Sequence, residues 1–285
     1  WQTADIAQPE TAAIATRWFD AMLRTTAREV TDLFKKYRLS EALMAVYKLF
    51  WDEFSSWYLE MVKPAYGQPI DNKTYEQTLS FFDTLLKLLH PFMPFITEEL
   101  WQHIYDRQPG ESIMVSPLRM DEPTKEDADS IAGIYIVHIE NVKSIVAGVR
   151  TVRNQKNIAP KEALTLEVVG GNPEADFEGV IKKMANLTAI NTVTQKGEGT
   201  ASFMVGTTEY AVPLGNLIDV EAEIAKQEAE LKHLEGFLTG VLKKLSNERF
   251  VANAPAAVVD MERKKQADAE SKIAALKESL AKLKK

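Results

Sequence analysis

The sequence predicts a mainly α-helical protein in three parts: a helical bundle at residues 1–115, a small α+β module at residues 116–216 and an antiparallel coiled-coil hairpin at residues 217–285. Three observations predict this organisation. Apolar residues recur every three or four positions in the first part, and short apolar segments alternate with glycine turns in the second. In the third part, two heptad repeats flank a break that contains Pro255.

The helical pattern of the first part extends from about residue 11 to 107 and contains three apolar stripes, each typical of a helix that buries one face. Pro64 and Gly67 end the second helix, and Pro91 and Pro94 end the third. We expect these helices to pack as a bundle. The stripes are Phe19, Leu23, Val30, Leu33 and Tyr37; Leu43, Val46, Tyr47, Phe50, Phe54 and Tyr58; and Leu79, Phe82, Leu85, Leu86 and Leu89.

A short fourth helix is predicted after these prolines. Thr97 precedes two glutamates, an arrangement typical of a helix N-cap with acidic residues in the first turn. This helix would bury Leu100 and Trp101. We interpret the aromatic residues of segment 90–101 as core residues rather than as a platform on which bases stack.

The middle part begins with a polar stretch, residues 121–129, which predicts a linker. A helix to about Gln155 follows, and then short strands around one more helix. Gly197, Gly199 and Gly206 mark the turns between the last strands. The predicted strands are residues 163–169, 189–194, 200–205 and 209–214, and the predicted second helix is residues 174–185.

Two heptad seams in the last part predict a coiled coil that folds back on itself. Each arm has roughly thirty residues, so at about 1.5 Å of rise per residue the hairpin should extend about 40 to 45 Å. The first seam contains Leu217, Val220, Ile224, Gln227, Leu231, Leu234, Leu238, Val241 and Leu245. The second contains Val259, Glu262, Gln266, Ala269, Ile273, Leu276, Leu280 and Leu283.

Composition restricts the function. Apolar residues make up 45% of the 285 residues, enough for buried cores, and no apolar run approaches the roughly 20 residues of a membrane span. There is no cysteine and the four histidines are scattered, so we predict no metal site. The net charge of −7 argues against sequence-blind nucleic-acid binding, because any RNA affinity must then come from local basic patches. The first residues contain neither an initiator methionine nor a signal peptide, so we expect a part of a longer chain.

Basic residues cluster at three places that suit a polyanion. The first cluster is a stripe on the first helix, where spacings of seven, four and seven place four cations within about 40° of one line. The second lies at the end of the predicted helix that reaches Gln155, and the third lies around the hairpin bend. The clusters are Arg17, Arg24, Arg28 and Lys35 with Lys36 and Arg38 after them; Lys143, Arg150, Arg153, Asn154 and Lys156; and Lys243, Lys244, Arg249, Phe250, Arg263, Lys264 and Lys265. In each case the alternative interpretation is an ordinary solvated helix face.

Recognisable catalytic motifs are missing from the sequence. It contains no P-loop, no GxGxxG motif and no histidine next to a nucleophile motif. Glu98 and Glu99 are adjacent on a predicted helix, so they point to different faces and make a poor acid and base pair. We therefore predict no catalytic residue and no catalysis by this chain alone.

Several motifs together resemble one family. Segments 50–60 (Phe-Trp-Asp-Glu-Phe-Ser-Ser-Trp-Tyr-Leu-Glu), 90–101, 149–154 (Val-Arg-Thr-Val-Arg-Asn) and 215–223 are similar to the C-terminal portion of the valyl-tRNA synthetases, a family of class I aminoacyl-tRNA synthetases. The bend segment, residues 245–255 (Leu-Ser-Asn-Glu-Arg-Phe-Val-Ala-Asn-Ala-Pro), is the part most specific to that family. The resemblance implies that residues 1–115 form an anticodon-binding domain and that the hairpin is an arm that packs on the outer corner of tRNA.

The resemblance also implies the partner and the cofactors. The partner would be valine tRNA, whose anticodons end in the invariant bases A and C, and the location would be the cytoplasm. The family's HxGH-type and KMSKS-type motifs are absent, so ATP and magnesium are expected in a catalytic domain outside this chain and no cofactor is expected within it. The alternative function is a coiled-coil module that recruits another protein. We expect a monomer, since an intramolecular hairpin satisfies its own seam.

Overall fold

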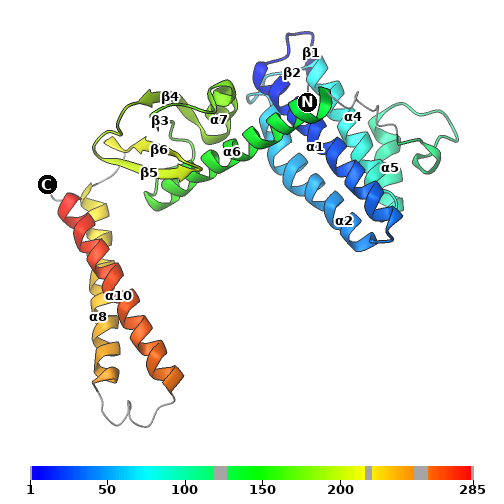
Figure 1. Cartoon of the computed structure of the whole chain (residues 1–285). Helices are drawn as coiled ribbons and strands as arrows, with labels where there is room; N and C mark the ends of the chain where they lie inside the picture. Colours follow the sequence, from blue (N-terminus) through cyan, green and yellow to red (C-terminus); the bar gives the residue numbers. More distant parts are fainter. Residues whose placement is uncertain (1, 119–126, 216–219, 247–255, 284–285) are drawn as a thin grey trace. The chain divides into compact units, whose positions relative to one another are not determined.

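The computed structural model describes residues 2–118, 127–215, 220–246 and 256–283 (Figure 1). It confirms a mainly helical fold with a small sheet. Contacts divide the chain into two compact units, Trp1–Arg153 with Ala159–Pro213 and Asn154–Ile158 with Leu214–Lys285. The helical bundle and the α+β module therefore pack within one unit, and the hairpin belongs to the other. The division into three domains stays a prediction.

The bundle forms because its helices bury most residues of the predicted apolar stripes. The prediction was wrong for Tyr37, Leu43 and Tyr47, which are 89%, 38% and 52% exposed because no described segment packs over them. Asp71 caps the N-terminus of α4, where its carboxylate accepts a hydrogen bond of 2.8 Å from the Thr74 backbone N–H. The elements are α1 (Glu10–Lys35), α2 (Leu39–Lys48), the π-helix η1 (Leu49–Tyr58), α3 (Leu59–Val62), α4 (Asn72–Leu89), α5 (Pro94–Ile104) and the 3-10 helix η2 (Ile113–Val115), with the short parallel strands β1 (Thr3–Ala4) and β2 (Ile70–Asp71).

Aromatic rings fill the centre of the bundle. The ring of Phe19 lies 5.2 Å from Phe54, 5.0 Å from Tyr58 and 5.2 Å from Phe81, measured between ring centroids. The Tyr58 hydroxyl pairs with the Thr78 hydroxyl at 2.8 Å, and burial raises the pKa of this phenol. The core therefore joins α1, η1 and α4.

Helix α5 departs from the prediction. It begins at Pro94 rather than after Thr97, since a proline suits the first helical position. The Thr97 hydroxyl is instead inside the helix, where it bonds to the Met93 carbonyl at 2.8 Å and to His90 Nδ1 at 2.7 Å. Trp101 is buried as predicted, but Leu100 is 37% exposed.

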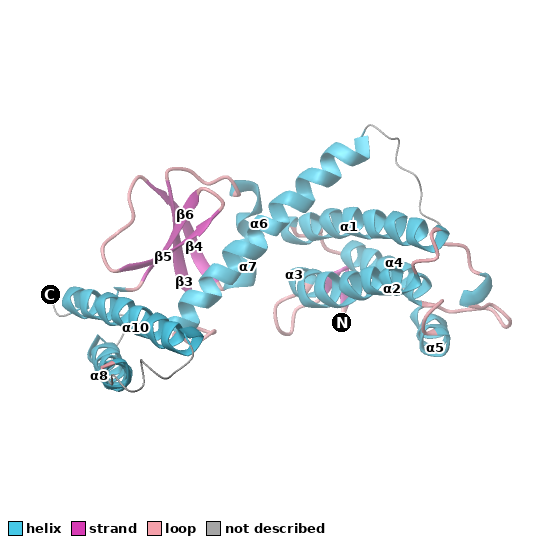
Figure 2. Ribbon diagram, turned by 60° about the horizontal axis from the view of Figure 1, so that its bottom comes forward, coloured by secondary structure: helices cyan, strands magenta, loops and turns pink. Residues whose placement is uncertain are grey.

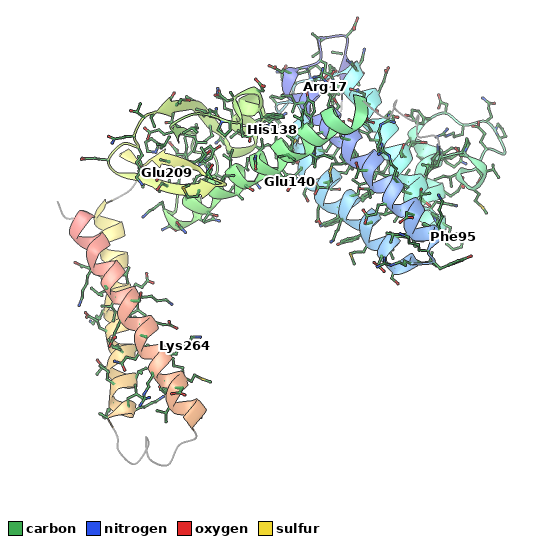
Figure 3. The ribbon with its side chains drawn as sticks, viewed as in Figure 1. Arg17, Phe95, His138, Glu140, Glu209 and Lys264 are labelled. Atoms are coloured by element: carbon green, nitrogen blue, oxygen red, sulfur yellow. The ribbon has the colours of Figure 1, made fainter. Side chains whose placement is uncertain are left out.

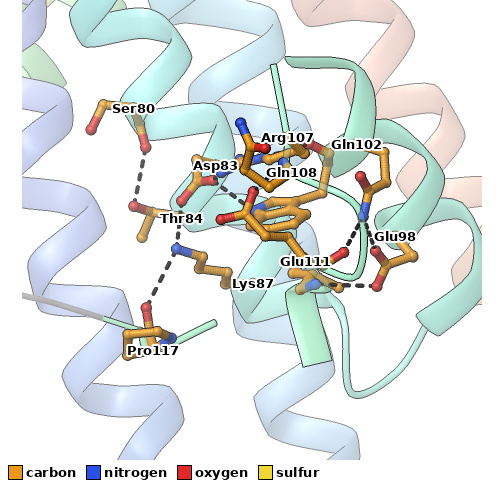
Figure 4. A network of polar contacts seen from close by, with 12 residues as sticks. Ser80, Asp83, Thr84, Lys87, Glu98, Gln102, Arg107, Gln108, Glu111 and Pro117 are labelled. Carbon is orange, nitrogen blue, oxygen red and sulfur yellow. Dashed lines mark hydrogen bonds and ion pairs between the residues drawn. The ribbon is translucent and has the colours of Figure 1, made fainter. Parts of the chain in front are cut away.

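The loop after α5 is held by a polar network (Figure 4). Trp101 Nε1 donates to Asp83 Oδ1 at 2.7 Å, and the Arg107 guanidinium lies 3.5 Å from the Trp101 ring centroid. The Glu98 carboxylate accepts hydrogen bonds from Gln102 and Ser112, and these bonds lower its pKa. Loop residues are thereby fixed against α4 and α5.

The α+β module places α6 (Asp127–Gln155) along one face of a four-stranded sheet (Figure 2). The order is β4-β3-β6-β5, with β3 and β4 parallel across α7 and the other pairs antiparallel. All four predicted strands are confirmed to within two residues. The elements are β3 (Leu164–Val169), the 3-10 helix η3 (Ala175–Phe177), α7 (Glu178–Ala185), β4 (Leu187–Val193), β5 (Thr200–Val205) and β6 (Thr208–Pro213).

Gly148 lets α6 approach the sheet closely. A Cβ atom at this position would lie 2.2 Å from the Phe203 ring, far inside van der Waals contact. Replacement of Gly148 by alanine should therefore lower the free energy of unfolding by about 1–3 kcal/mol, measured by urea denaturation. The matched control is Gly133→Ala on the same helix, which has open space and should gain up to about 1 kcal/mol. Equal stability of the two variants would contradict the close packing.

The hairpin consists of α8 (Val220–Leu245) and α10 (Ala256–Leu283), which run side by side in opposite directions (Figure 1). Its described residues confirm the predicted seam. Val241, Val259, Ala269, Ile273 and Leu280 are all at most 8% exposed, and they occupy heptad positions. Lys277 Nζ lies 2.8 Å from Glu235 Oε1, an ion pair that joins the two arms.

Candidate nucleic-acid interface

The predicted stripe on α1 starts beside α6. Arg17 is exposed, and its Nη1 donates a hydrogen bond of 2.9 Å to the Tyr135 hydroxyl (Figure 3). Further along α1, Arg24 is half-buried and pairs with Asp20 at 2.7 Å, whereas Arg28 and Lys35 are exposed. The stripe is thus a surface feature for most of its length.

Three exposed cations lie within four positions at the C-terminal end of α1. Lys36 pairs with Asp32 and Arg38 pairs with Glu41, and both pairs are more than half exposed. Exposed ion pairs of this kind contribute about 0–1 kcal/mol, so the cations can exchange their carboxylate partners for phosphates at little cost. Lys35 is also exposed at this end.

Exposed aromatic rings lie at the same end of the bundle. Tyr37, in the turn after α1, has φ 58° and is 89% exposed, and Phe95 in α5 is 90% exposed. The Phe34 and Phe92 rings, 5.7 Å apart, hold the turn before α5 against the end of α1. We call Lys35, Lys36, Tyr37, Arg38 and Phe95 the basic-aromatic end. Aromatic faces among cations are what a single-stranded RNA loop requires.

The interpretation of the aromatic residues in segment 90–101 as core was therefore wrong for Phe95. The sequence did contain a signal. Thr97 and Trp101 mark the buried face of α5, and Phe95 lies two residues before Thr97, about 200° away at 100° per residue. A ring on that opposite face must be exposed unless another segment covers it.

Two predicted RNA-contact residues of α6 are directed into the protein instead. Lys143 pairs with Glu53 and with Glu140, and its ammonium lies 5.0 Å from the Trp18 ring centroid. The Arg153 guanidinium is buried and donates to the carbonyls of Ala159, Glu162, Ala185 and Asn186 at 2.7–3.1 Å. Both side chains are occupied by structural contacts, which removes them from the candidate interface.

The remaining members of the second cluster differ in exposure. Arg150 is exposed beside the Trp57 ring, with 5.6 Å between the guanidinium carbon and the ring centroid. Asn154 is exposed and Lys156 is half-buried. These three stay predicted contacts.

On the hairpin, the described cations lie on its solvent side. Lys243 is exposed, as is Lys264, which is labelled in Figure 3, and Arg263 pairs loosely with Asp260 at 3.8 Å. Lys265 and Lys244 flank the seam carboxylate of Glu262 at 2.7 and 3.7 Å, and the hydrogen bond from Lys265 lowers the pKa of Glu262. The other predicted residues of this cluster, Arg249 and Phe250, lie outside the described residues.

Within the described ranges, no group of three or more His, Cys, Asp or Glu side chains has the arrangement of a metal site. The same ranges contain no helix of the length and apolar character that a membrane crossing requires.

The fold and these surfaces define an RNA-binding module: a helical bundle with a basic-aromatic end, joined to a coiled-coil arm. Residues 16–169 match the family model described as the anticodon-binding domain of tRNA ligase, and residues 219–284 match the valyl tRNA synthetase tRNA binding arm. The chain therefore belongs to the anticodon-binding domain family of tRNA ligases, in its valyl-tRNA synthetase branch.

Relatives agree over the full length of the chain. It is 68% identical over 285 residues to a valine–tRNA ligase of Phocaeicola vulgatus and 64% identical over 288 residues to that of Bacteroides thetaiotaomicron. In each case the match covers 100% of this chain and 32% of the relative. A valine–tRNA ligase of Agrobacterium fabrum is 34% identical over 283 residues, covering 96% of this chain and 29% of the relative. The chain thus spans about a third of the length of these relatives and corresponds to their C-terminal part.

Proposed function

We propose that this chain recognises valine tRNA as the C-terminal part of a valine–tRNA ligase. The bundle would contact the anticodon stem-loop, and the hairpin would contact the outer corner of the tRNA. One observation carries the proposal: the region that matches the anticodon-binding family, residues 16–169, includes the bundle whose end carries cations around the exposed Tyr37 and Phe95.

The chemistry of this end suits an RNA loop. Unpaired bases of a loop splay outward and stack on aromatic faces, while lysine and arginine neutralise the phosphates between them. Because the chain has a net charge of −7, binding of this kind depends on the local arrangement of cations rather than on overall charge. We also include Arg17, Arg24 and Arg28 in the interface, on the anticodon stem.

The rest of the ligase would supply the chemistry. Attachment of valine to tRNA, with ATP and magnesium, is assigned here to the two thirds of the relatives that this chain does not span. We further propose a cytoplasmic location and a monomer. The monomer is supported by the seam of the hairpin that the chain's own two arms form, in which Val241, Val259, Ala269, Ile273 and Leu280 are at most 8% exposed. The alternative function, recruitment of another protein through the coiled coil, has no support from the relatives.

Titration of the chain with valine tRNA, at several salt concentrations, tests the proposal. We expect tighter binding to valine tRNA than to the same tRNA with a changed anticodon, because the basic-aromatic end contacts the loop bases. A single altered base should weaken binding roughly tenfold, equivalent to about 1.4 kcal/mol. Equal binding to both tRNAs would exclude anticodon readout, and an absence of binding would exclude tRNA recognition by this part.

The same titration locates the α1 contacts. With Arg17, Arg24 and Arg28 all replaced by glutamine, the affinity should depend less steeply on salt, since fewer counterions are released from the RNA. The matched control is a variant with three cations removed elsewhere in the same unit, at Lys161, Lys182 and Lys196. An unchanged salt slope in the α1 variant would exclude the stripe from the interface.

A further inference from the structure

A cavity in the first unit has no role in the interface described above. It measures about 590 Å³ and lies where the C-terminal end of α3 meets α6 and α7. Its size is in the range that holds a small ligand or a nucleotide unit. The walls are formed by Glu60, Lys63, Pro64, Arg150, Lys183 and Met184, with Ala65 beside them.

Three cations and one carboxylate line this cavity, so its charge favours an anion. Lys183 Nζ donates to the carbonyls of Met61 and Lys63, both at 2.7 Å. These carbonyls belong to the last turn of α3 and the residue after it, which form the negative end of the helix dipole. Burial lowers the pKa of the Lys183 ammonium. The ammonium nevertheless lies at the negative end of the helix and offsets its partial charge. This end of the helix therefore does not repel an anion in the cavity.

The other two cations can reorganise around a ligand. Among the described residues, the Arg150 guanidinium makes one long hydrogen bond, of 3.4 Å, from Nη2 to the Met184 carbonyl. Lys63 pairs with Glu60 at 3.3 Å, and both side chains are more than half exposed. Such a pair is weak and is readily exchanged for a phosphate, and the planar fork of arginine suits phosphate oxygens.

The remaining wall is apolar. Pro64, Ala65 and Met184 present no charged group, and the Trp57 ring lies next to Arg150. A cavity lined by two adaptable cations and by apolar residues matches a phosphate attached to a sugar better than it matches a free inorganic anion.

We propose that this cavity binds one nucleotide unit of the RNA backbone, with its phosphate between Lys63 and Arg150 and its ribose against Pro64 and Ala65. This inference rests on the proposed function, because it supplies a second contact for the same tRNA. The contact lies on the α+β module side of the unit, where α6 and α7 meet the bundle. It gives the module a direct part in RNA binding.

Charge variants of the whole chain test the site by titration with valine tRNA across several salt concentrations. Lys63→Gln combined with Arg150→Gln should weaken binding roughly tenfold at low salt and reduce the slope of log affinity against log salt by about one. Glu60→Gln removes the one carboxylate among the described residues that line the cavity and should strengthen binding roughly threefold. The matched control is Lys182→Gln combined with Lys196→Gln, two exchanges outside the cavity that should change affinity less than twofold.

Weaker binding of the Lys63 and Arg150 variant and stronger binding of the Glu60 variant are together expected only of a phosphate site. A general loss of charge or of folding would not change the affinity in opposite directions. A folded Lys63 and Arg150 variant that binds like the control pair would overturn the cavity site and leave the proposed function intact. The same conclusion follows if Glu60→Gln fails to strengthen binding. If the unaltered chain does not bind the tRNA, the proposed function fails and the cavity site fails with it. Thermal unfolding of each variant confirms that affinities are compared between folded proteins.

Discussion

Replacement of Arg153 by alanine is expected to lower the free energy of unfolding by about 3 kcal/mol. The side chain is 5% exposed, and its guanidinium donates to four backbone carbonyls of residues 159, 162, 185 and 186. These carbonyls belong to the turn before β3 and to the junction of α7 with β4. Without the guanidinium, one buried and three partly buried hydrogen bonds are lost, and their carbonyls lose a charged donor.

Urea denaturation of the single variants measures this effect. Arg150→Ala is the matched control, since it removes an arginine one turn earlier on α6 whose contacts with described residues are a long hydrogen bond and a ring contact. It should cost about 0.5 kcal/mol or less. Arg153→Lys should recover only part of the loss, because one ammonium cannot reach four carbonyls. If Arg153→Ala were as stable as Arg150→Ala but bound tRNA more weakly than the unaltered chain does, the structural role assigned to Arg153 would be wrong.

Deletion of residues 219–285 is expected to weaken binding of valine tRNA by roughly 10- to 100-fold without unfolding the bundle. The deleted residues include the exposed Lys243 and Lys264, and each phosphate contact that they make contributes to affinity through the release of counterions. The bundle should remain folded because its aromatic core, around Phe19 and Tyr58, lies wholly within the first unit.

Titration with valine tRNA and a thermal melt of the truncated chain measure the two effects separately. A full-length variant with Lys243, Lys264 and Lys265 replaced by glutamine serves as the control that keeps the hairpin. If the charge of the hairpin causes the loss of affinity, this variant should reproduce a large part of that loss. If the shape of the hairpin is the cause, the variant should reproduce little of it. Full affinity in the truncated chain would show that the hairpin does not contact the tRNA.

Repeating patterns made the hairpin and the strands predictable. Every described residue of the hairpin with an exposed fraction below 9%, from Val241 to Leu280, occupies a position that the heptad repeat assigns to the interior. Strand β5 has the predicted bounds, residues 200–205, because glycines before and after it fix where pairing ends. Such patterns are local, since the partner of each residue lies at a fixed spacing or across a short turn.

Whether a single polar side chain is exposed or paired inside the protein was not predictable in this way. In the sequence, the residues around Arg150 form a single basic cluster. In the structure, however, Lys143 pairs with Glu53, 90 positions away, and Arg153 donates to carbonyls up to 33 positions away. No short-range pattern contains these partners. Phe95 shows the converse, because its segment is rich in aromatic residues but no described segment covers its face of α5.

The mainly helical fold, the antiparallel hairpin, the absence of recognisable catalytic motifs and the family could all be predicted from the amino-acid sequence, because they depend on periodicity and on contiguous motifs. The packed structure was needed to show which cations face the solvent, that Tyr37 and Phe95 belong to the basic-aromatic end, and that Lys63, Arg150 and Lys183 line one cavity. The physical reason is that burial and charge pairing are set by whichever segments pack together, and in this chain those segments are separated by tens of residues.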